Sequence, residues 1–270
     1  MRTAVNRISV LIFVTILACG ALSEALFSQA PCHVTFPTAN LSIPYVSGEP
    51  PLGIDPAAAP WRDAGTARMV RDCSRTVSYP DLDTEVRAFW TDRSLYLLFA
   101  CPYHSLNRFP PGPNGDDRDK LWDRDVVEVF LGDDWKNIRR YREYEIAPTG
   151  ERVDLAIDLD AGGDGRAWNS GWETRARIDE AARIWYAAAR IPLASVSSAS
   201  VVPGVRWRIN LYRIDGAGPD SQRRFLCWQP TCVLNRDPNH VPEAFGTLTF
   251  QPGVRPGAGA PRSHRGHDPR

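Results

Sequence analysis

The sequence has no excess of charge of either sign, because 32 basic side chains are balanced by 32 acidic ones over 270 residues. Proteins that hold nucleic acid or an anionic membrane surface by electrostatics carry a basic patch, so this balance argues against both partners. The chain also lacks GxSxG, HExxH, a phosphate-cradling glycine loop and the dinucleotide-binding glycine fingerprint. No common catalytic motif therefore assigns a reaction to it.

Metal and haem motifs are missing as well. The cysteines show neither CxxC nor CxxCH spacing, and no paired histidines accompany them, which argues against zinc and covalently attached haem. Haem held by axial methionine and histidine is a separate alternative, for which Met69 with His33, His104 or His240 would supply the ligands. A redox sandwich domain is therefore kept as one hypothesis.

No segment has a long helical period with caps; short β patterns separated by turns take its place. The expected strands are Glu85–Trp90, Leu95–Cys101, Val126–Leu131, Tyr144–Ala147, Val153–Ile157, Trp172–Ile178, Ile184–Ile191, Arg206–Asp215 and Gly246–Phe250. Many short strands at near-regular spacing predict an all-β, antiparallel β-sandwich formed by a single domain.

Both ends of the chain differ in composition from this domain. Residues 1–25 have basic residues followed by a short apolar run, which predicts a signal segment, and Cys19 in a lipobox-like context is the alternative, a lipid anchor. Residues 26–51 are expected to form an extended lead-in, residues 52–250 the domain, and residues 251–270 a disordered tail. The protein is thus expected to be secreted, periplasmic or held at the cell surface.

Export changes the interpretation of the cysteines, because oxidising compartments favour disulfides. Cys227 and Cys232 could close a small loop around WQPT, and Cys32 with Cys73 is a candidate second bridge. Cys101 ends a hydrophobic strand and is expected to be a buried thiol.

The most informative stretch is Leu121–Gly132, LWDRDVVEVFLG, in which one carboxylate interrupts an apolar strand. Alternation places Glu128 on the same face as Val126 and Phe130, and both faces look covered. Because a carboxylate on a covered face is costly unless it is bonded, Glu128 is either a structural acid or a site acid that reaches for hydroxyl groups.

Sugar binding needs an exposed indole with polar neighbours, since the apolar face of a pyranose stacks on tryptophan. Trp122 and Trp228 lie next to turns and are the candidates, whereas Trp90, Trp185 and Trp207 lie within strands and are expected in the core. In one straight strand Trp122 and Glu128 would stand about 20 Å apart, so the residues between them must turn the indole back.

Two other readings of the acidic residues remain open. Asp123, Asp125 and Glu128 could supply the two carboxylates of a glycoside hydrolase, which require separations of about 5–10 Å that a sequence does not reveal. The acidic, glycine-rich segment Asp158–Gly165 could hold a structural calcium ion, although it lacks the full EF-hand spacing, which favours a solvated turn.

A set of segments in this order resembles the family 9 carbohydrate-binding modules and their bacterial relatives. The segments are LWDRDVVEVFLG, YEIAPTGERVD, ARIPL, VRWRINLYRID and NHVPEAFGTLTF, and the resemblance as a whole covers about residues 52–250. The resemblance implies a jelly-roll-like β-sandwich, non-catalytic binding of a glucan or xylan chain end between two tryptophans, and structural calcium. It makes a carbohydrate chain the expected partner of a monomeric protein.

The match to the family's motifs assigns candidate site residues one position at a time. Trp122 matches the tryptophan before the D-x-V-E strand and Glu128 the acid within it, while Trp228 is the candidate for the second tryptophan. Asn210 matches the asparagine of W-x-x-N, and His240 precedes PE-x-FG. The glutamate that is common before the IP pair is replaced here by Ala188, so one polar contact or structural partner of the family is absent.

Overall fold

The computed structural model describes residues 38–110, 117–136, 138–162, 165–233 and 237–253. The expected signal segment with Cys19, the residues Cys32 and His33, and residues 254–270 of the expected tail lie outside these ranges. Within the described ranges, no helix has the length and apolar character needed to cross a membrane.

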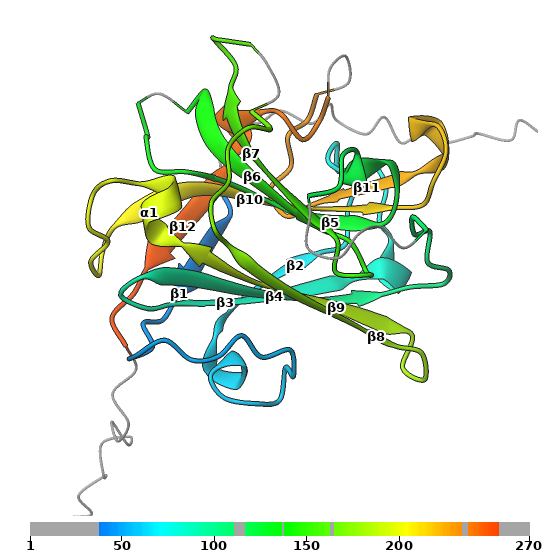
Figure 1. Ribbon diagram of the computed structural model, residues 1–270. Coiled ribbons are helices and arrows are strands. Elements are labelled where there is room, and N and C mark those ends of the chain that lie inside the picture. Colours follow the sequence, from blue (N-terminus) through cyan, green and yellow to red (C-terminus); the bar gives the residue numbers. More distant parts are fainter. Residues whose placement is uncertain (1–37, 111–116, 137, 163–164, 234–236, 254–270) are drawn as a thin grey trace, which may run out of the picture. The chain divides into compact units, whose positions relative to one another are not determined.

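Two β-sheets make up the domain (Figure 1). The described part of the first sheet contains, in spatial order, β1 (Asn40–Ile43), β12 (Gly246–Phe250), β10 (Arg206–Asp215), β5 (Val126–Gly132), β6 (Arg140–Ile146) and β7 (Arg152–Asp158), with β11 (Arg224–Cys227) also paired to β10. The second contains β2 (Gly65–Met69), β3 (Thr84–Trp90), β4 (Ser94–Pro102), β9 (Ile184–Pro192) and β8 (Glu173–Asp179). The expected all-β sandwich is confirmed.

Pairing is antiparallel throughout these two sheets except between β1 and β12, which run parallel. The described helices are single turns: α1 (Leu193–Val196) and the 3-10 helices η1 (Trp61–Asp63), η2 (Pro80–Leu82), η3 (Leu121–Asp123), η4 (Asp220–Gln222) and η5 (Pro242–Ala244). They lie in the connections between strands, where η3 and η4 shape the site described below.

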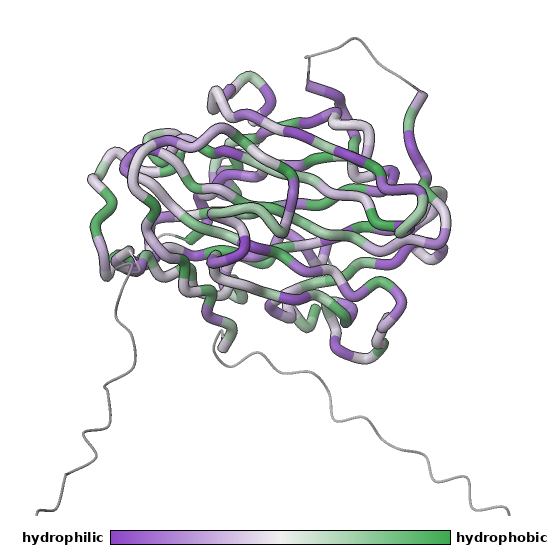
Figure 2. The backbone as a smooth tube through the Cα atoms, turned by 90° about the horizontal axis from the view of Figure 1, so that it is seen from below, coloured by the Kyte–Doolittle hydropathy of each residue, from purple (hydrophilic) through white to green (hydrophobic). Residues whose placement is uncertain are grey.

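The main core lies between the two sheets. The inner face of β5 contributes Val127, Val129 and Leu131, which alternate with the outward-facing residues as the sequence indicated. Trp90, Trp185 and Trp207 are buried in this core, as expected. Figure 2 shows hydrophobic segments alternating with hydrophilic ones along the strands, the pattern by which each strand buries one face.

Some strand bounds differ from the sequence-based expectation. β10 and β12 have the expected bounds, whereas β6 begins at Arg140 instead of Tyr144, because its charged first half is ladder-paired to β7. β1 lies within the expected lead-in and pairs with β12, so the sheet recruits residues before position 52. A four-residue strand such as β1 has too little alternation to be distinguished from an extended connection.

The disulfide pairing differs from both expected bridges. Cys73 bonds to Cys227, so Cys227 does not close a loop with Cys232, and Cys73 does not bond to Cys32. The reason is that β11 is paired to β10, which holds Cys227 beside the segment that carries Cys73; Cys232 is itself disulfide-bonded. Cys101 is a free, buried cysteine, as expected, and burial raises its pKa to about 12.

Candidate functional site

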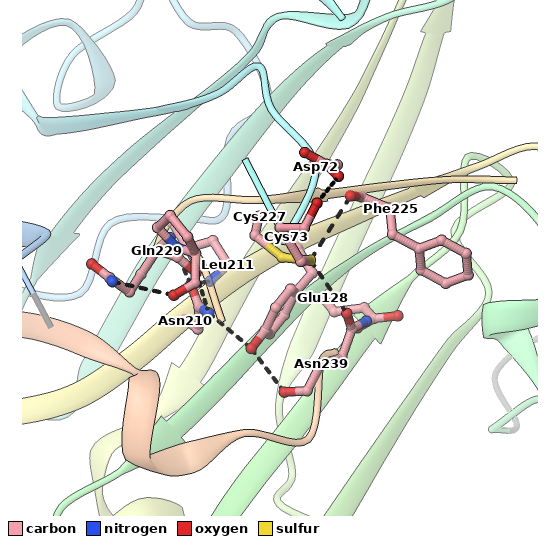
Figure 3. The surroundings of a disulfide bond; sticks show 12 residues. Asp72, Cys73, Glu128, Asn210, Leu211, Phe225, Cys227, Gln229 and Asn239 are labelled. Atoms are coloured by element: carbon pink, nitrogen blue, oxygen red, sulfur yellow. Dashed lines mark hydrogen bonds between the residues drawn. A yellow bond between two sulfur atoms is a disulfide. The ribbon is translucent and has the colours of Figure 1, made fainter. Parts of the chain in front are cut away.

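A cavity of about 1160 Å³ lies on the outer face of the first sheet. Its floor includes residues of β5, β6, β7 and β10, among them Glu128, Glu143 and Ile157. The walls come from η3, η4 and two segments, residues 72–74 and 237–240. The disulfide between Cys73 and Cys227 therefore stands at the edge of this cavity, where Figure 3 shows it close to Glu128 and Asn239.

Trp122 and Glu128 line the same cavity, which satisfies the geometric condition set by the sequence. The turn between them is η3, after which Arg124 is extended and β5 begins at Val126. The Trp122 ring is half-buried, and the guanidinium of Arg166 lies over it, 5.6 Å from the ring centroid. Trp122 thus lies outside the main core between the sheets; it packs against the hydrophobic cluster on the outer face and forms part of the cavity wall.

Three glutamates meet on the cavity floor. Glu128 on β5 is directly opposite Glu145 on β6, and Glu143 lies two residues away on the same face of β6. Their exposed fractions are 2%, 0% and 3% for Glu128, Glu145 and Glu143. Like charges directly opposite each other across two strands are destabilising, so this row is an arrangement that packing alone does not favour.

Their hydrogen bonding is incomplete. Glu128 Oε2 accepts a hydrogen bond of 2.8 Å from Asn239 Nδ2. Glu143 and Glu145 share a side-chain hydrogen bond, but no N–H or alcohol group among the described residues donates to either oxygen of Glu145 or to Glu143 Oε2. Glu143 Oε2 has a longer contact of 3.8 Å with Nε2 of His240.

Burial raises the pKa of all three carboxyl groups, and their mutual repulsion adds to the effect for Glu128 and Glu145. For Glu128, the nearby Glu143 and Asp237 raise the pKa further, while the hydrogen bond from Asn239 acts in the opposite direction. The three glutamates on the cavity floor therefore lose their protons at a higher pH than a free glutamate does.

A pH-dependent stability follows from these shifts. The pKa of Glu145 is higher in the folded state than in the unfolded state, so its protonated form contributes to the free energy of unfolding. This contribution is fully present below about pH 4.5 and is lost as the pH rises through the folded-state pKa. Glu145→Gln should therefore raise the melting temperature more at pH 8 than at pH 4.5, by at least about 3 °C, since one unit of pKa shift is worth about 1.4 kcal/mol.

Calorimetric melting at the two pH values measures this difference. Glu173→Gln, which changes a solvent-exposed acid on β8, is the matched control. An equal change in melting temperature for Glu145→Gln at both pH values would contradict the raised pKa of Glu145.

A chain of hydrogen bonds supports Glu128 from behind. Asn210 Nδ2 donates to the Tyr212 hydroxyl at 2.8 Å, and that hydroxyl donates to the backbone carbonyl of Asn239 at 2.8 Å. Asn239 then donates its side-chain amide to Glu128. Asn210 is completely buried and outside the cavity lining, so the structure gives it a role in positioning Asn239.

His240 is in the cavity wall and is half-buried. Its Nδ1 is 2.6 Å from the Tyr141 hydroxyl, and its ring packs against Phe130 at 5.2 Å between centroids. Of the five candidate residues, the structure thus brings together Trp122, Glu128 and His240 at the cavity.

Trp228 is not brought to the cavity. It packs against the main core, with its ring against Gly246, and it is absent from the cavity lining. Side chains alternate along β11, so Phe225 and Cys227 turn to the outer face while Leu226 and Trp228 turn to the core. Phe225 is therefore an aromatic ring that lines the cavity in addition to Trp122.

The cavity carries a strong excess of acidic groups. The acidic residues in its lining are Asp72, Asp123, Glu128, Glu143, Glu145, Asp220 and Asp237. The arginines in the lining are Arg166 and Arg223, which pair with Asp119 and Asp220. The balanced charge of the whole chain therefore hides a local imbalance at this site.

The residues named for calcium or haem have other partners where the structure describes them. No group of three or more histidine, cysteine, aspartate or glutamate side chains there could hold a metal ion. In the acidic loop, Asp158 and Asp160 pair with Arg140 and Arg139. For haem, Met69 is completely buried in the main core, and His104 pairs with Asp81.

Several site residues could not be found from the sequence. The alternation in RYREYEI places Tyr141, Glu143 and Glu145 on one face of β6, but only the register with β5 sets Glu145 against Glu128. Asn239 and Arg223 are in irregular segments, so no periodic pattern marked them.

Comparison with known proteins defines the fold further. No protein-family model matches the chain, and no curated protein matches it in sequence. Among solved structures, a family 9 carbohydrate-binding module from Caldicellulosiruptor kristjanssonii in complex with cellotriose superposes with a TM-score of 0.57 at 15% identity, covering 83% of this chain and 98% of that chain. The glucose complex described for a module of the same family and organism gives 0.56 at 15% identity, covering 81% and 98%.

A protein from Bacteroides uniformis has a TM-score of 0.61 at 20% identity, with 78% of this chain and 99% of that chain covered. These similarities establish the family 9-like sandwich fold that the sequence resemblance implied.

Proposed function

We propose that this protein binds the end of a carbohydrate chain without transforming it, in the cavity on the outer face of the first sheet. The observation that carries the proposal is the placement of a half-buried indole, Trp122, and a buried carboxyl group, Glu128, in one cavity. Its volume of about 1160 Å³ is ample for one or two sugar rings. Similar folds that hold cellotriose and glucose support the same ligand class.

The aromatic and polar residues of the cavity are proposed to make different kinds of contact with the sugar. The Trp122 ring offers an apolar face for a pyranose, and Phe225 supplies a further aromatic surface on the wall. Glu128, held by Asn239, can accept hydroxyl hydrogen bonds, while His240 and Arg223 can donate to sugar oxygens. Contacts with one or two rings correspond to dissociation constants in the micromolar to millimolar range, about 4–8 kcal/mol.

Export is part of the proposal. The bridge between Cys73 and Cys227 joins residues 154 positions apart at the cavity edge, and such bridges persist in oxidising compartments. The site is proposed to work outside the cytoplasm on glucan or xylan chains. Trp228 and Asn210, which lie outside the cavity lining, are proposed to support the site and not to touch the sugar.

Calorimetric titration with glucose, xylose, cello-oligosaccharides and xylo-oligosaccharides tests the proposed function. At least one of these sugars should bind with a stoichiometry near one, and no binding by any member of the panel would reject it.

Catalysis is tested on the same purified protein by following the release of reducing sugar from the oligosaccharides. We expect none, because burial raises the pKa of Glu128, Glu143 and Glu145 alike, whereas glycoside hydrolysis uses two carboxyl groups whose environments set their pKa values apart. Sustained release of reducing ends would replace binding with hydrolysis as the function.

A further inference from the structure

Among the described residues, no N–H or alcohol group donates to Glu143 Oε2, Glu145 Oε1 or Glu145 Oε2 on the cavity floor, and the side-chain hydrogen bond between Glu143 and Glu145 uses one oxygen of Glu145 and leaves the other without a donor. Both side chains belong to β6 and point to the same face of the sheet. Both are more than nine-tenths buried. A buried polar atom with no partner is unfavourable, so a ligand that brings donors to this point would remove a cost that the free protein bears.

The number and charge of these acceptors favour a particular kind of donor. A sugar hydroxyl brings one hydrogen, whereas a protonated primary amine brings three N–H donors and a positive charge. Among the described residues of the surrounding lining, carboxyl groups outnumber arginines, and Arg166 and Arg223 are each paired with an aspartate, which adds to the preference. Hydrogen bonds between an ammonium and a carboxylate are about twice as strong as neutral ones.

A bare metal ion fits less well, since the described residues contain no group able to hold one. The aromatic wall formed by Trp122 and Phe225 suits a ring attached to the charged group. Resting on the proposed function, we infer that the preferred ligand is an amino sugar at a chain end, whose ammonium group is held by Glu143 and Glu145 while its ring lies against Trp122.

Proton release is a further consequence of this assignment. The charged groups around Glu145 are Glu143 on β6, Glu128 on β5, Asp123 on η3, Asp237 and His240 in the 237–240 segment, and Arg223 beside η4. Burial, the neighbouring acids and the hydrogen bond with Glu143 raise the pKa of Glu145 in the free protein, which favours its protonated form. An ammonium group favours the ionised carboxylate, so the carboxyl proton passes to solvent when the amino sugar binds.

The test compares glucosamine with glucose and N-acetylglucosamine, which share its ring but are neutral. Calorimetric titrations at pH 6.5, in two buffers with different ionisation enthalpies, measure affinity and proton release together. We expect glucosamine to bind at least tenfold more tightly than either neutral sugar and to release close to one proton. Glu145→Gln should abolish this preference, whereas Glu173→Gln, on the surface of β8, should retain it.

The other outcomes separate this inference from the proposed function. If glucose binds as tightly as glucosamine, the amino-sugar assignment is wrong and carbohydrate binding stands. If ethylamine binds as tightly as glucosamine, the cavity recognises the charge alone and the assignment to a sugar is wrong. If none of the sugars binds, including the oligosaccharide panel, both proposals are rejected.

Discussion

Replacing Trp122 with alanine is expected to weaken sugar binding by about 10- to 100-fold. The indole supplies a large flat apolar surface in the cavity wall, and losing the burial of one such side chain is worth about 1.5–3 kcal/mol. Trp122→Phe should recover part of the affinity, because a smaller ring still offers a face for stacking. Titration with the strongest ligand of the sugar panel measures the effect.

The comparison needs a tryptophan that is exposed elsewhere. Trp135 has 39% of its surface exposed and is absent from the cavity lining, so Trp135→Ala is the matched control and should leave affinity unchanged. Melting temperatures of both variants check that the fold is retained. Unchanged affinity in folded Trp122→Ala would remove the indole from the site, and equal losses in both variants would point to a binding surface outside the cavity.

The sandwich could be predicted because its strands carry their own periodicity. In β10, Trp207, Ile209 and Leu211 alternate with the residues of the other face, and the structure reproduces the expected bounds. In β6 the outward-facing positions carry charged side chains, so nothing in the sequence indicated that this face is also buried. Glu143 and Glu145 occupy the outer face that a solvated strand would give to polar groups, yet wall segments from elsewhere in the chain cover them.

The site was predictable only where neighbours in sequence are neighbours in space. Trp122 and Glu128 are six residues apart in one motif, and a single turn brings both to the cavity. Trp228 illustrates the limit of such reasoning. It follows a strand in which one step along the chain reverses the side-chain direction, so Phe225 and Cys227 face the outer side and Trp228 faces the core.

Contacts between distant segments could not be deduced in the same way. The pairing of Glu128 with Glu145 depends on strand register, and the support from Asn210 and Tyr212 on β10 to Asn239 joins two separate parts of the chain. The motif match did select Asn210 and His240, but a match does not say whether a residue touches the ligand or holds one that does. The structure makes that distinction through burial and hydrogen bonding.

Removing the bridge between Cys73 and Cys227 is expected to lower the free energy of unfolding by about 2–5 kcal/mol, which corresponds to a fall in melting temperature of roughly 5–15 °C. The bridge closes a long loop, since its ends lie 154 positions apart, so its loss returns much conformational freedom to the unfolded chain. Calorimetric melting of the double variant Cys73→Ala/Cys227→Ala measures the change. Cys101→Ala, which removes a buried thiol outside the bridge, is the control and should cost less.

Sugar affinity in the same double variant tests whether the bridge also maintains the cavity. Cys73 belongs to the wall, its neighbours Asp72 and Ser74 are part of the lining, and its backbone carbonyl accepts the N–H groups of Thr231 and Cys232 at 3.0 Å. Those two backbone bonds remain when the sulfur atoms are removed, so affinity measured well below the melting temperature should fall less than threefold. A much larger loss would mean that the covalent link, and not the backbone contacts, holds the wall against β11; an unchanged melting temperature would contradict the stabilising role of the bridge itself.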